Sequence, residues 1–381
     1  MKVNRYIYIS LLTALLIGWG CLLTSCTDQT DIELEHPNDH GGMPLHVVGL
    51  TRGEGDPEQE SDPEQESDPL RGQTVRLFLN QGETTQKGVL TYSGKNTSSD
   101  MMFGSSDLMV KPGNDYLVFG YLPSEAVSAS SDVTVSNTNA ATMTIKDIPS
   151  ISTEDISVVI GVKGKLTADD NKVVAGSFKY HAPENTEEGY GVSLLVDHLY
   201  AAVKLKFLVD PGYAALRTIK LHKVTLKTAR EKKLNATVSL TMNETGTNPI
   251  SSVPPVYADS ENSQDKEIVL YQSTNSDGDE LSATTPLFIT GYFAPGYATD
   301  LKIESQYEVY DKKDSENPLP SPIDEDEEAP EYRYAVNDLK TVCTGMTRGL
   351  KKTVNMTIIP TYLYILSDND LDNPTIVVGS N

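Results

Sequence analysis

The sequence predicts an all-β protein built from two β-sandwich domains in tandem. Apolar and polar residues alternate in many short runs, which is the period of a strand with one buried and one exposed face. Gly, Pro, Asn, Asp and Ser fill the gaps between the runs, and no window has a long, well-capped helical pattern. Many short strands separated by turn signals predict a sandwich or a barrel.

The clearest run covers residues 200–209, where Val203, Leu205, Phe207 and Val209 are in phase. Another begins at Thr74. Further strands are predicted at residues 116–122, 142–148, 156–162, 216–226, 236–242, 267–271, 286–293, 301–310 and 353–359.

One of these runs changes phase. Ile219 and Leu221 follow one alternation, whereas Val224 and Leu226 follow the other. An extra residue in a strand, a β-bulge, shifts the alternation by one. We therefore predict a bulge near residues 222–223.

The first 25 residues have the form of a secretory signal peptide. Lys2 and Arg5 supply a positive start, and an apolar stretch at residues 7–23 precedes small residues and Cys26. The stretch is too short for a permanent membrane span. Residues 23–26, Leu-Thr-Ser-Cys, match the lipobox of bacterial lipoproteins, which predicts lipidation of Cys26. The alternative is an ordinary signal peptide with an incidental cysteine.

Composition limits the partners and the chemistry. The net charge of −23 disfavours nucleic acid as a partner, because phosphate binding needs clustered Lys and Arg. Cys21 leaves with the signal and Cys26 takes the lipid, so Cys343 remains alone and no disulfide framework is expected. We predict that Cys343 is a buried apolar group.

The segment between the signal and the first long strand run has three parts. Residues 26–42 are a polar tether, and residues 43–50 are a short apolar island followed by Arg52. A tandem DPEQES repeat comes next, with eight acids and no base between Glu54 and Asp68. Such a segment repels itself and is predicted to be disordered. The predicted sandwiches then occupy residues 73–190 and 191–381, and residues 312–330 form an exposed acidic loop between strands.

No catalytic or phosphate-binding motif is present. The sequence lacks HExxH, GxSxG, GxxxxGK[ST] and CxxC, and its six His are scattered. Alternating acids at residues 368–372 could chelate calcium, but the glycine and the closing glutamate of a calcium loop are missing. A polar turn is favoured there. We expect no enzyme activity, no cofactor and no metal site.

The order of features resembles the fimbrillins, the subunits of type V pili. A lipobox, an apolar island ending in Arg and a β-rich remainder follow one another as in that family. Residues 197–205, which start Asp-His-Leu-Tyr, resemble its strand at the start of the second half. Residues 345–349, Gly-Met-Thr-Arg-Gly, resemble its late Arg-Gly segment, and residues 118–121 its aromatic strand. The DPEQES repeat departs from the family.

This resemblance implies two transthyretin-like β-sandwiches and a mode of assembly. In fimbrillins an N-terminal strand fills a groove of its own subunit until an arginine-specific protease removes it at the cell surface. The open groove exposes apolar surface and unpaired backbone groups, and the C-terminal segment of a neighbouring subunit fills it. The chain would then be a structural or adhesive subunit at the outer membrane. Its partners would be other pilus subunits and, in an adhesive role, a host or bacterial surface ligand.

The chain offers a matching part for each step. Residues 43–50 are the candidate plug strand, and Arg52 is the candidate cleavage site, with Arg71 as the alternative. The plug could instead be a permanent strand and the tail a hairpin on its own domain. A lipid-anchored pilus anchor and a surface glycan-binding lipoprotein remain alternatives, although the only Trp, Trp19, lies in the signal. The candidate donor tail comprises Tyr362, Tyr364, Leu366, Ile376 and Val378.

Overall fold

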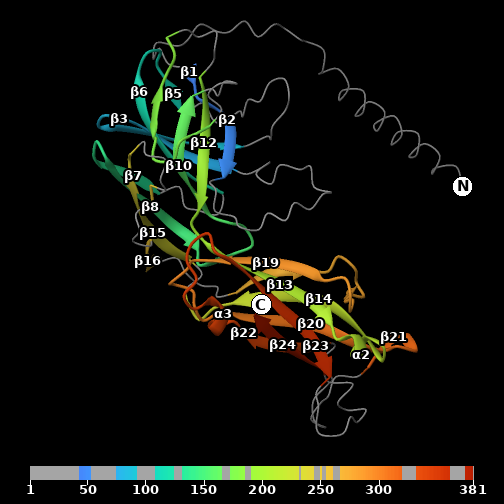
Figure 1. The fold of residues 1–381 in the computed structure, drawn as a ribbon. Helices are drawn as coiled ribbons and strands as arrows, with labels where there is room; N and C mark the ends of the chain where they lie inside the picture. Colours follow the sequence, from blue (N-terminus) through green and yellow to red (C-terminus); the bar gives the residue numbers. More distant parts are fainter. Residues whose placement is uncertain are drawn as a thin grey trace, which may run out of the picture. The chain divides into compact units, whose positions relative to one another are not determined.

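The prediction of an all-β protein is confirmed by the computed structural model (Figure 1), in which nearly all the described elements are strands. The helices among the described residues are one turn each, α2 (Pro211–Ala214) and α3 (Lys340–Cys343). None of the described helices is both long and apolar enough to cross a membrane. The structure describes residues 43–52, 74–91, 108–123, 131–164, 172–184, 190–230, 233–243, 249–250, 255–260, 267–319, 332–360 and 374–380.

A first hydrophobic core lies between a seven-stranded and a four-stranded sheet. The larger sheet has the order β2-β12-β10-β6-β3-β4, with β11 paired to β6, and the smaller has the order β16-β15-β8-β7. Phe119 and Tyr121 from β6 share this core with Met143 and Ile145 from β8, and all four are buried. The strands are β2 (His46–Arg52), β3 (Thr74–Gln81), β4 (Thr84–Thr91), β6 (Asp115–Leu122), β7 (Asp132–Asn137), β8 (Ala140–Pro149), β10 (Ser157–Gly164), β11 (Lys179–His181), β12 (Gly191–His198), β15 (Lys233–Thr241) and β16 (Val256–Asp259).

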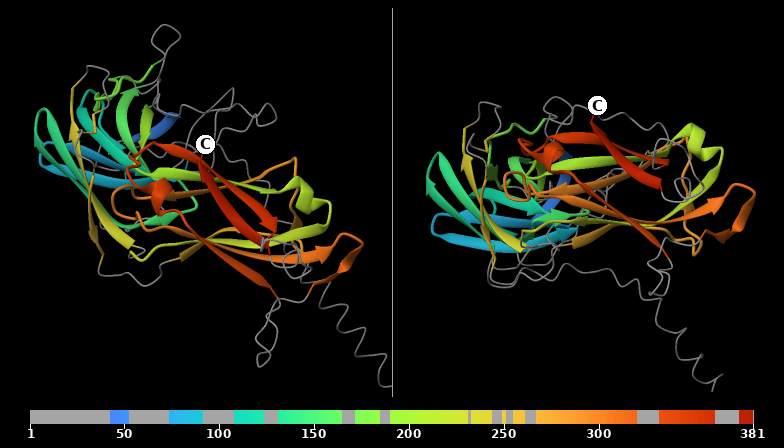
Figure 2. Two further views of the ribbon diagram at one scale, coloured as in Figure 1. Left: turned by 60° about the horizontal axis from the view of Figure 1, so that its bottom comes forward. Right: turned by 90° about the horizontal axis from the view of Figure 1, so that it is seen from below.

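A second core lies between a five-stranded and a six-stranded sheet, whose layers are seen in two further views (Figure 2). The first has the order β24-β23-β13-β19-β9, and the second has the order β17-β14-β20-β21, with β18 on β14 and β22 on β20. The strands are β9 (Ile151–Ser152), β13 (Ala201–Val209), β14 (Arg217–Lys227), β17 (Glu267–Gln272), β18 (Asp279–Glu280), β19 (Leu287–Phe293), β20 (Lys302–Asp311), β21 (Asp314–Pro318), β22 (Arg333–Asp338), β23 (Lys351–Pro360) and β24 (Pro374–Ser380); the two-residue strands β1 (Met43–Pro44) and β5 (Met109–Val110) complete the described set.

The chain passes between the two cores more than once. Strand β12 pairs with β10 in the first core, and β13 follows in the second after two residues. The chain then returns, because β15 pairs with β8 along nearly its whole length. Strand pairing thus crosses the predicted boundary at residues 190/191, and the two domain ranges remain a prediction.

The predicted bulge in β14 is confirmed. Its pairing with β20 shifts register between Leu221 and Lys223. Ile219 and Leu221 before the shift and Val224 and Leu226 after it are all buried in the second core. The bulge therefore lets one strand bury both phases of its apolar pattern.

Candidate assembly site

Strand β2 contains most of the predicted plug and lies at the edge of the seven-stranded sheet. It pairs in parallel with β12, from His46 beside Gly191 to Arg52 beside Val196. Just before it, Leu45 is only 2% exposed, and its N–H donates to the carbonyl of Leu108 at 2.8 Å. Loss of residues 43–52 would leave one side of β12 without its backbone partners.

The edge that β2 covers belongs to a deeply buried strand. Seven of the eight residues of β12 are buried, and Leu195 is partly exposed. Val192, Leu194 and Val196 have no measurable exposure. An uncovered β12 would therefore combine apolar surface with unpaired ladder groups, which is the combination that attracts a replacement strand.

The predicted cleavage sites differ in their positions. Arg52 is the last residue of β2, and its backbone pairs with β12. The sequence had suggested instead that Arg52 lies in a disordered stretch after the strand. Arg71 lies outside the described residues, as does the lipidation candidate Cys26. A protease that binds an extended peptide around Arg52 would first have to loosen the end of β2.

The described part of the predicted tail is strand β24, which pairs antiparallel with β23 in the protein's own sheet. Ile376 lies opposite Ile358, is 4% exposed and belongs to the second core. Val378 is partly buried against the same core, and the side-chain amide of Asn337 donates to the carbonyl of Ile376 at 2.9 Å. Tyr362, Tyr364 and Leu366 lie outside the described residues, as does the segment at residues 368–372 that was considered for calcium.

Two of the segments that resemble fimbrillins meet where β12 passes into β13. The Nη1 of Arg348 donates to Oδ2 of Asp197 at 2.6 Å and to the carbonyl of His198 at 3.3 Å. The side chains of Arg348 and Asp197 are 22% and 12% exposed. A salt bridge this shielded is costly to break from one side, because the remaining charge stays buried.

The same junction holds a second buried pair. The Nδ1 of His198 lies 2.6 Å from Oδ2 of Asp155, which also accepts a hydrogen bond from the hydroxyl of Ser157 at 2.7 Å. The N–H of Gly349 donates to the carbonyl of Tyr200 at 2.7 Å. These contacts fix the start of β23 against the β12–β13 passage, so the strand that holds β2 and the strand that holds β24 share one anchor.

Cys343 is buried in the second core, as predicted. Burial raises the pKa of its thiol to about 12. Since the thiolate is the nucleophile, this cysteine is inert near neutral pH. Its role is packing.

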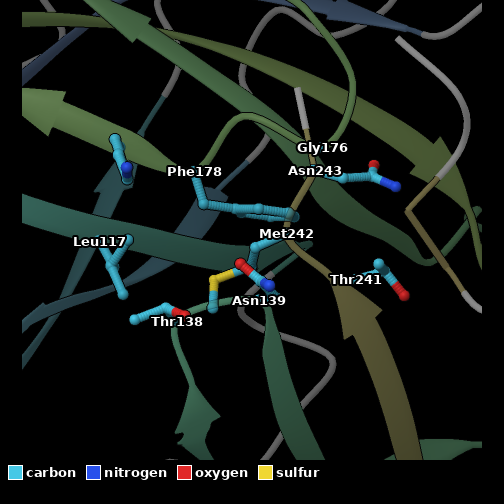
Figure 3. A pocket seen from close by; sticks show the side chains of 9 residues that line it. Leu117, Thr138, Asn139, Gly176, Phe178, Thr241, Met242 and Asn243 are labelled. Atoms are coloured by element: carbon cyan, nitrogen blue, oxygen red, sulfur yellow. The ribbon is translucent and has the colours of Figure 1, made fainter. Parts of the chain in front are cut away.

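A hollow of about 590 Å³ opens in the first-core region (Figure 3). Leu117, Phe178 and Met242 supply apolar surface, and Thr138 and Asn139 are among its polar lining groups. Among the described residues of the lining, Lys179 is the one with an ionisable side chain, so these residues supply no acid–base pair. Within the described residues, no group of three or more His, Cys, Asp or Glu side chains is placed to hold a metal.

Comparison with known proteins yields distant structural likenesses. No family model matches the sequence, and no curated protein does. Among solved structures, a presumed cell adhesion protein from Bacteroides uniformis aligns with 89% of this chain and 99% of its own at 13% identity and a TM-score of 0.41. A fimbrial protein from Bacteroides vulgatus aligns with 88% and 99% at 14% identity and 0.35. The fimbrial anchor protein Mfa2 from Porphyromonas gingivalis aligns with 89% and 98% at 11% identity and 0.28.

Proposed function

We propose that this chain is a structural or adhesive subunit of a cell-surface pilus. It is exported as a lipoprotein precursor and assembled by removal of an N-terminal strand and strand exchange with a neighbouring subunit. The observation that carries the proposal is β2: a strand from the N-terminal end of the described chain covers the edge of the buried strand β12. A cut between β2 and β3 turns this strand into a separate peptide that only non-covalent contacts retain.

The occupant of the vacated edge is the tail of another copy. Such an occupant must be extended, alternate apolar residues and supply ladder hydrogen bonds. Ile376 and Val378 provide this alternation in β24, and Tyr362, Tyr364 and Leu366 extend it in sequence. Release of β24 requires Ile376 to leave the second core, a cost that binding to β12 of the neighbour would offset.

The test is proteolytic assembly in vitro. Detergent-solubilised protein is treated with an arginine-specific protease, and its mass is followed by light scattering, beside Arg52→Ala, Arg71→Ala and a truncation after Thr361. We expect oligomers from cleaved wild type and none from the truncated chain. The arginine variant that stays intact identifies the cleavage site. Oligomers from the truncated chain would remove the tail from the mechanism.

Attachment to the membrane is tested separately. Cells are labelled with a fatty acid analogue, and wild type is compared with Cys26→Ala. We expect the label to be lost in the variant, since the lipobox sulfur is the proposed acceptor. Equal labelling of both proteins would contradict a lipid at Cys26.

A second candidate function is a pilus anchor that keeps its lipid and is never cut. Two observations favour this role. The backbone of Arg52 pairs with β12, and β24 already pairs with β23 in the sheet of its own subunit. In that state β12 keeps β2 as its partner and β23 keeps β24, so neither of these two strands offers an edge to a donor strand. N-terminal sequencing of the protein in isolated filaments separates the two roles: an anchor begins at Cys26, and a cleaved subunit begins after an arginine.

A further inference from the structure

The five-stranded sheet of the second core stands out by its charge. Its strands β9, β13, β19, β23 and β24 contain no Asp or Glu, although the whole chain has 54 acids and a net charge of −23. They do contain lysines, at positions 204 and 206 in β13 and at the start of β23. This sheet is therefore a neutral-to-basic area in a strongly acidic protein.

The lysines Lys204, Lys206 and Lys351 lie on the outer face of this sheet. In β13, Val203, Leu205 and Phe207 point into the second core, so the alternate positions 204 and 206 point away from it. Lys351 pairs with Ala202 in the parallel ladder and so shares that face. We name the outer face of β13, β19 and β23 the acid-free face, which β24 extends for as long as it remains in its own sheet.

The acid-free face also carries exposed apolar groups. Phe288 on β19 is 47% exposed and Val377 on β24 is 44% exposed. The Nζ of Lys204 lies 4.2 Å from the centre of the Phe288 ring, a cation–π contact that holds both side chains over the sheet. An aromatic ring and lysine stems on the outer face of a sheet provide packing surface as well as charge.

The opposite sheet shows that this pattern is not general. There Lys227 of β14 lies 3.2 Å from Glu267 and 2.9 Å from Glu304, and Lys312 lies 3.6 Å from Glu280. Within the described part of the chain, by contrast, no carboxylate forms an ion pair with Lys204, Lys206 or Lys351. Lys227 and Lys312 therefore have carboxylates of their own sheet beside them, whereas, among the described residues, the three lysines on the outer face of β13 and β23 do not.

We propose that the acid-free face is a contact surface for the acidic surface of a second copy of this chain, in addition to the exchanged strand. Two copies with a net charge of −23 repel each other, and this face is where the repulsion is smallest and a favourable charge pairing is available. A contact between two different surfaces of identical subunits runs head to tail, and it continues into a filament unless its rotation closes a ring. The inference rests on the proposed pilus function.

The experiment locates this contact chemically. Protein labelled with 15N is mixed with unlabelled protein, cleaved with the arginine-specific protease and treated with a carbodiimide, which joins a lysine amine directly to a neighbouring carboxylate. We expect mixed-isotope cross-links from Lys204, Lys206 or Lys351 to Asp or Glu. Cross-links from these lysines that join only residues of the same copy would overturn the proposal, as would mixed-isotope links confined to other lysines.

A charge-reversal variant supplies the matched test. Lys204→Glu, Lys206→Glu and Lys351→Glu together should raise the protein concentration needed for assembly by about tenfold or more, because like charges then face each other. The control reverses three exposed lysines elsewhere, Lys302, Lys313 and Lys340, with the same change in net charge. An equal effect of both variants would reduce the result to net charge and overturn the assignment of this face.

The outcomes separate this contact from strand exchange. Oligomers that need the tail but tolerate the charge reversal would uphold strand exchange and overturn the contact. A chain truncated after Thr361 that forms oligomers and gives mixed-isotope cross-links at the three lysines would uphold the contact and overturn strand exchange. If the face instead binds heparin, used as a probe for acidic polysaccharides, and gives no cross-links between copies, its partner is a glycan and the proposal is wrong.

Discussion

Strands β2 and β24 both lie at the edge of a sheet, but they are held differently. Strand β2 pairs in parallel with β12, whose sequence lies far away, whereas β24 pairs antiparallel with β23, the described strand that precedes it. Parallel pairing is slightly weaker per residue. The connection from β2 to the next strand, β3, starts directly after one candidate cleavage site, Arg52, and contains the other, Arg71.

Side chains add to this difference. Ile376 in β24 is part of the second core, and Asn337 of β22 donates to its carbonyl. Strand β24 is therefore held by its pairing with β23 and by a hydrogen bond from β22. An edge strand can thus be permanent or removable depending on how it is joined to its partner. The comparison predicts that β2 leaves after one cut, whereas β24 leaves only when a better partner is offered.

The largest expected effect on stability is at the Arg348–Asp197 contact, which anchors β12, the partner of β2, and β23, the partner of β24. Arg348→Ala removes the counter-ion of the shielded carboxylate of Asp197, which then keeps its hydrogen bond from the N–H of His198 but no longer has the Arg348 cation beside it. This loss should cost about 3–5 kcal/mol of unfolding free energy. The control Lys312→Ala breaks a pair whose side chains are about half exposed, and should cost about 0–1 kcal/mol. Urea denaturation measures both.

A small effect of Arg348→Ala would mean that β12 and β23 are fixed independently. In that case the stabilities of the two edge strands could be altered separately. Strong destabilisation by Arg348→Ala would mean that they share one cooperative unit.

The sequence predicts features that depend on neighbouring residues better than features that depend on pairing with a distant strand. The alternation in β13 and the phase change in β14 are local patterns, and both were predicted. Strand β4 was missed, because its sequence, TTQKGVLT, has little apolar alternation and is defined by pairing with β3 across a turn at Gly82, whose φ is +63°. Helix α3 has only four residues, too few for a periodic signal.

The candidate site was predictable only in part. The apolar island and the tail are visible in the sequence, but nothing local says that β2 pairs with β12 or that β24 pairs with β23. The partnership of Arg348 with Asp197 spans 151 positions and follows from the fold. The end of β2 was also misplaced: Arg52 looks like the start of a polar linker, yet its backbone continues the ladder to Val196.

The next prediction compares one buried apolar residue at each end. Leu45→Ala and Ile376→Ala should each lower the unfolding free energy by about 2–5 kcal/mol in the uncleaved protein, because both side chains are almost fully buried. Cleavage after Arg52 should change this. If the plug leaves, cleaved Leu45→Ala becomes identical to cleaved wild type, and its penalty disappears.

The penalty at Ile376 should persist until β24 is exchanged. Thermal unfolding of both variants before and after protease treatment distinguishes the two ends. A Leu45→Ala penalty that survives cleavage would show that the cut strand stays bound, and β2 would then be as permanent as β24.

The smallest expected effect is at the side-chain contact between β22 and β24. Asn337→Ala removes the amide donor to the carbonyl of Ile376 and should cost about 0.5–1.5 kcal/mol. Because the contact touches only β24, amide hydrogen exchange should become faster at residues 374–380 and stay unchanged in β2. Asn317→Ala, in the exposed β20–β21 hairpin, is the control and should alter neither strand.

If β24 is held mainly by the amide of Asn337, Asn337→Ala should also form oligomers faster after cleavage, since release of the tail would be easier. Faster exchange with no change in assembly rate would mean that removal of β2, and not release of β24, limits assembly, which would make the N-terminal edge the controlling one.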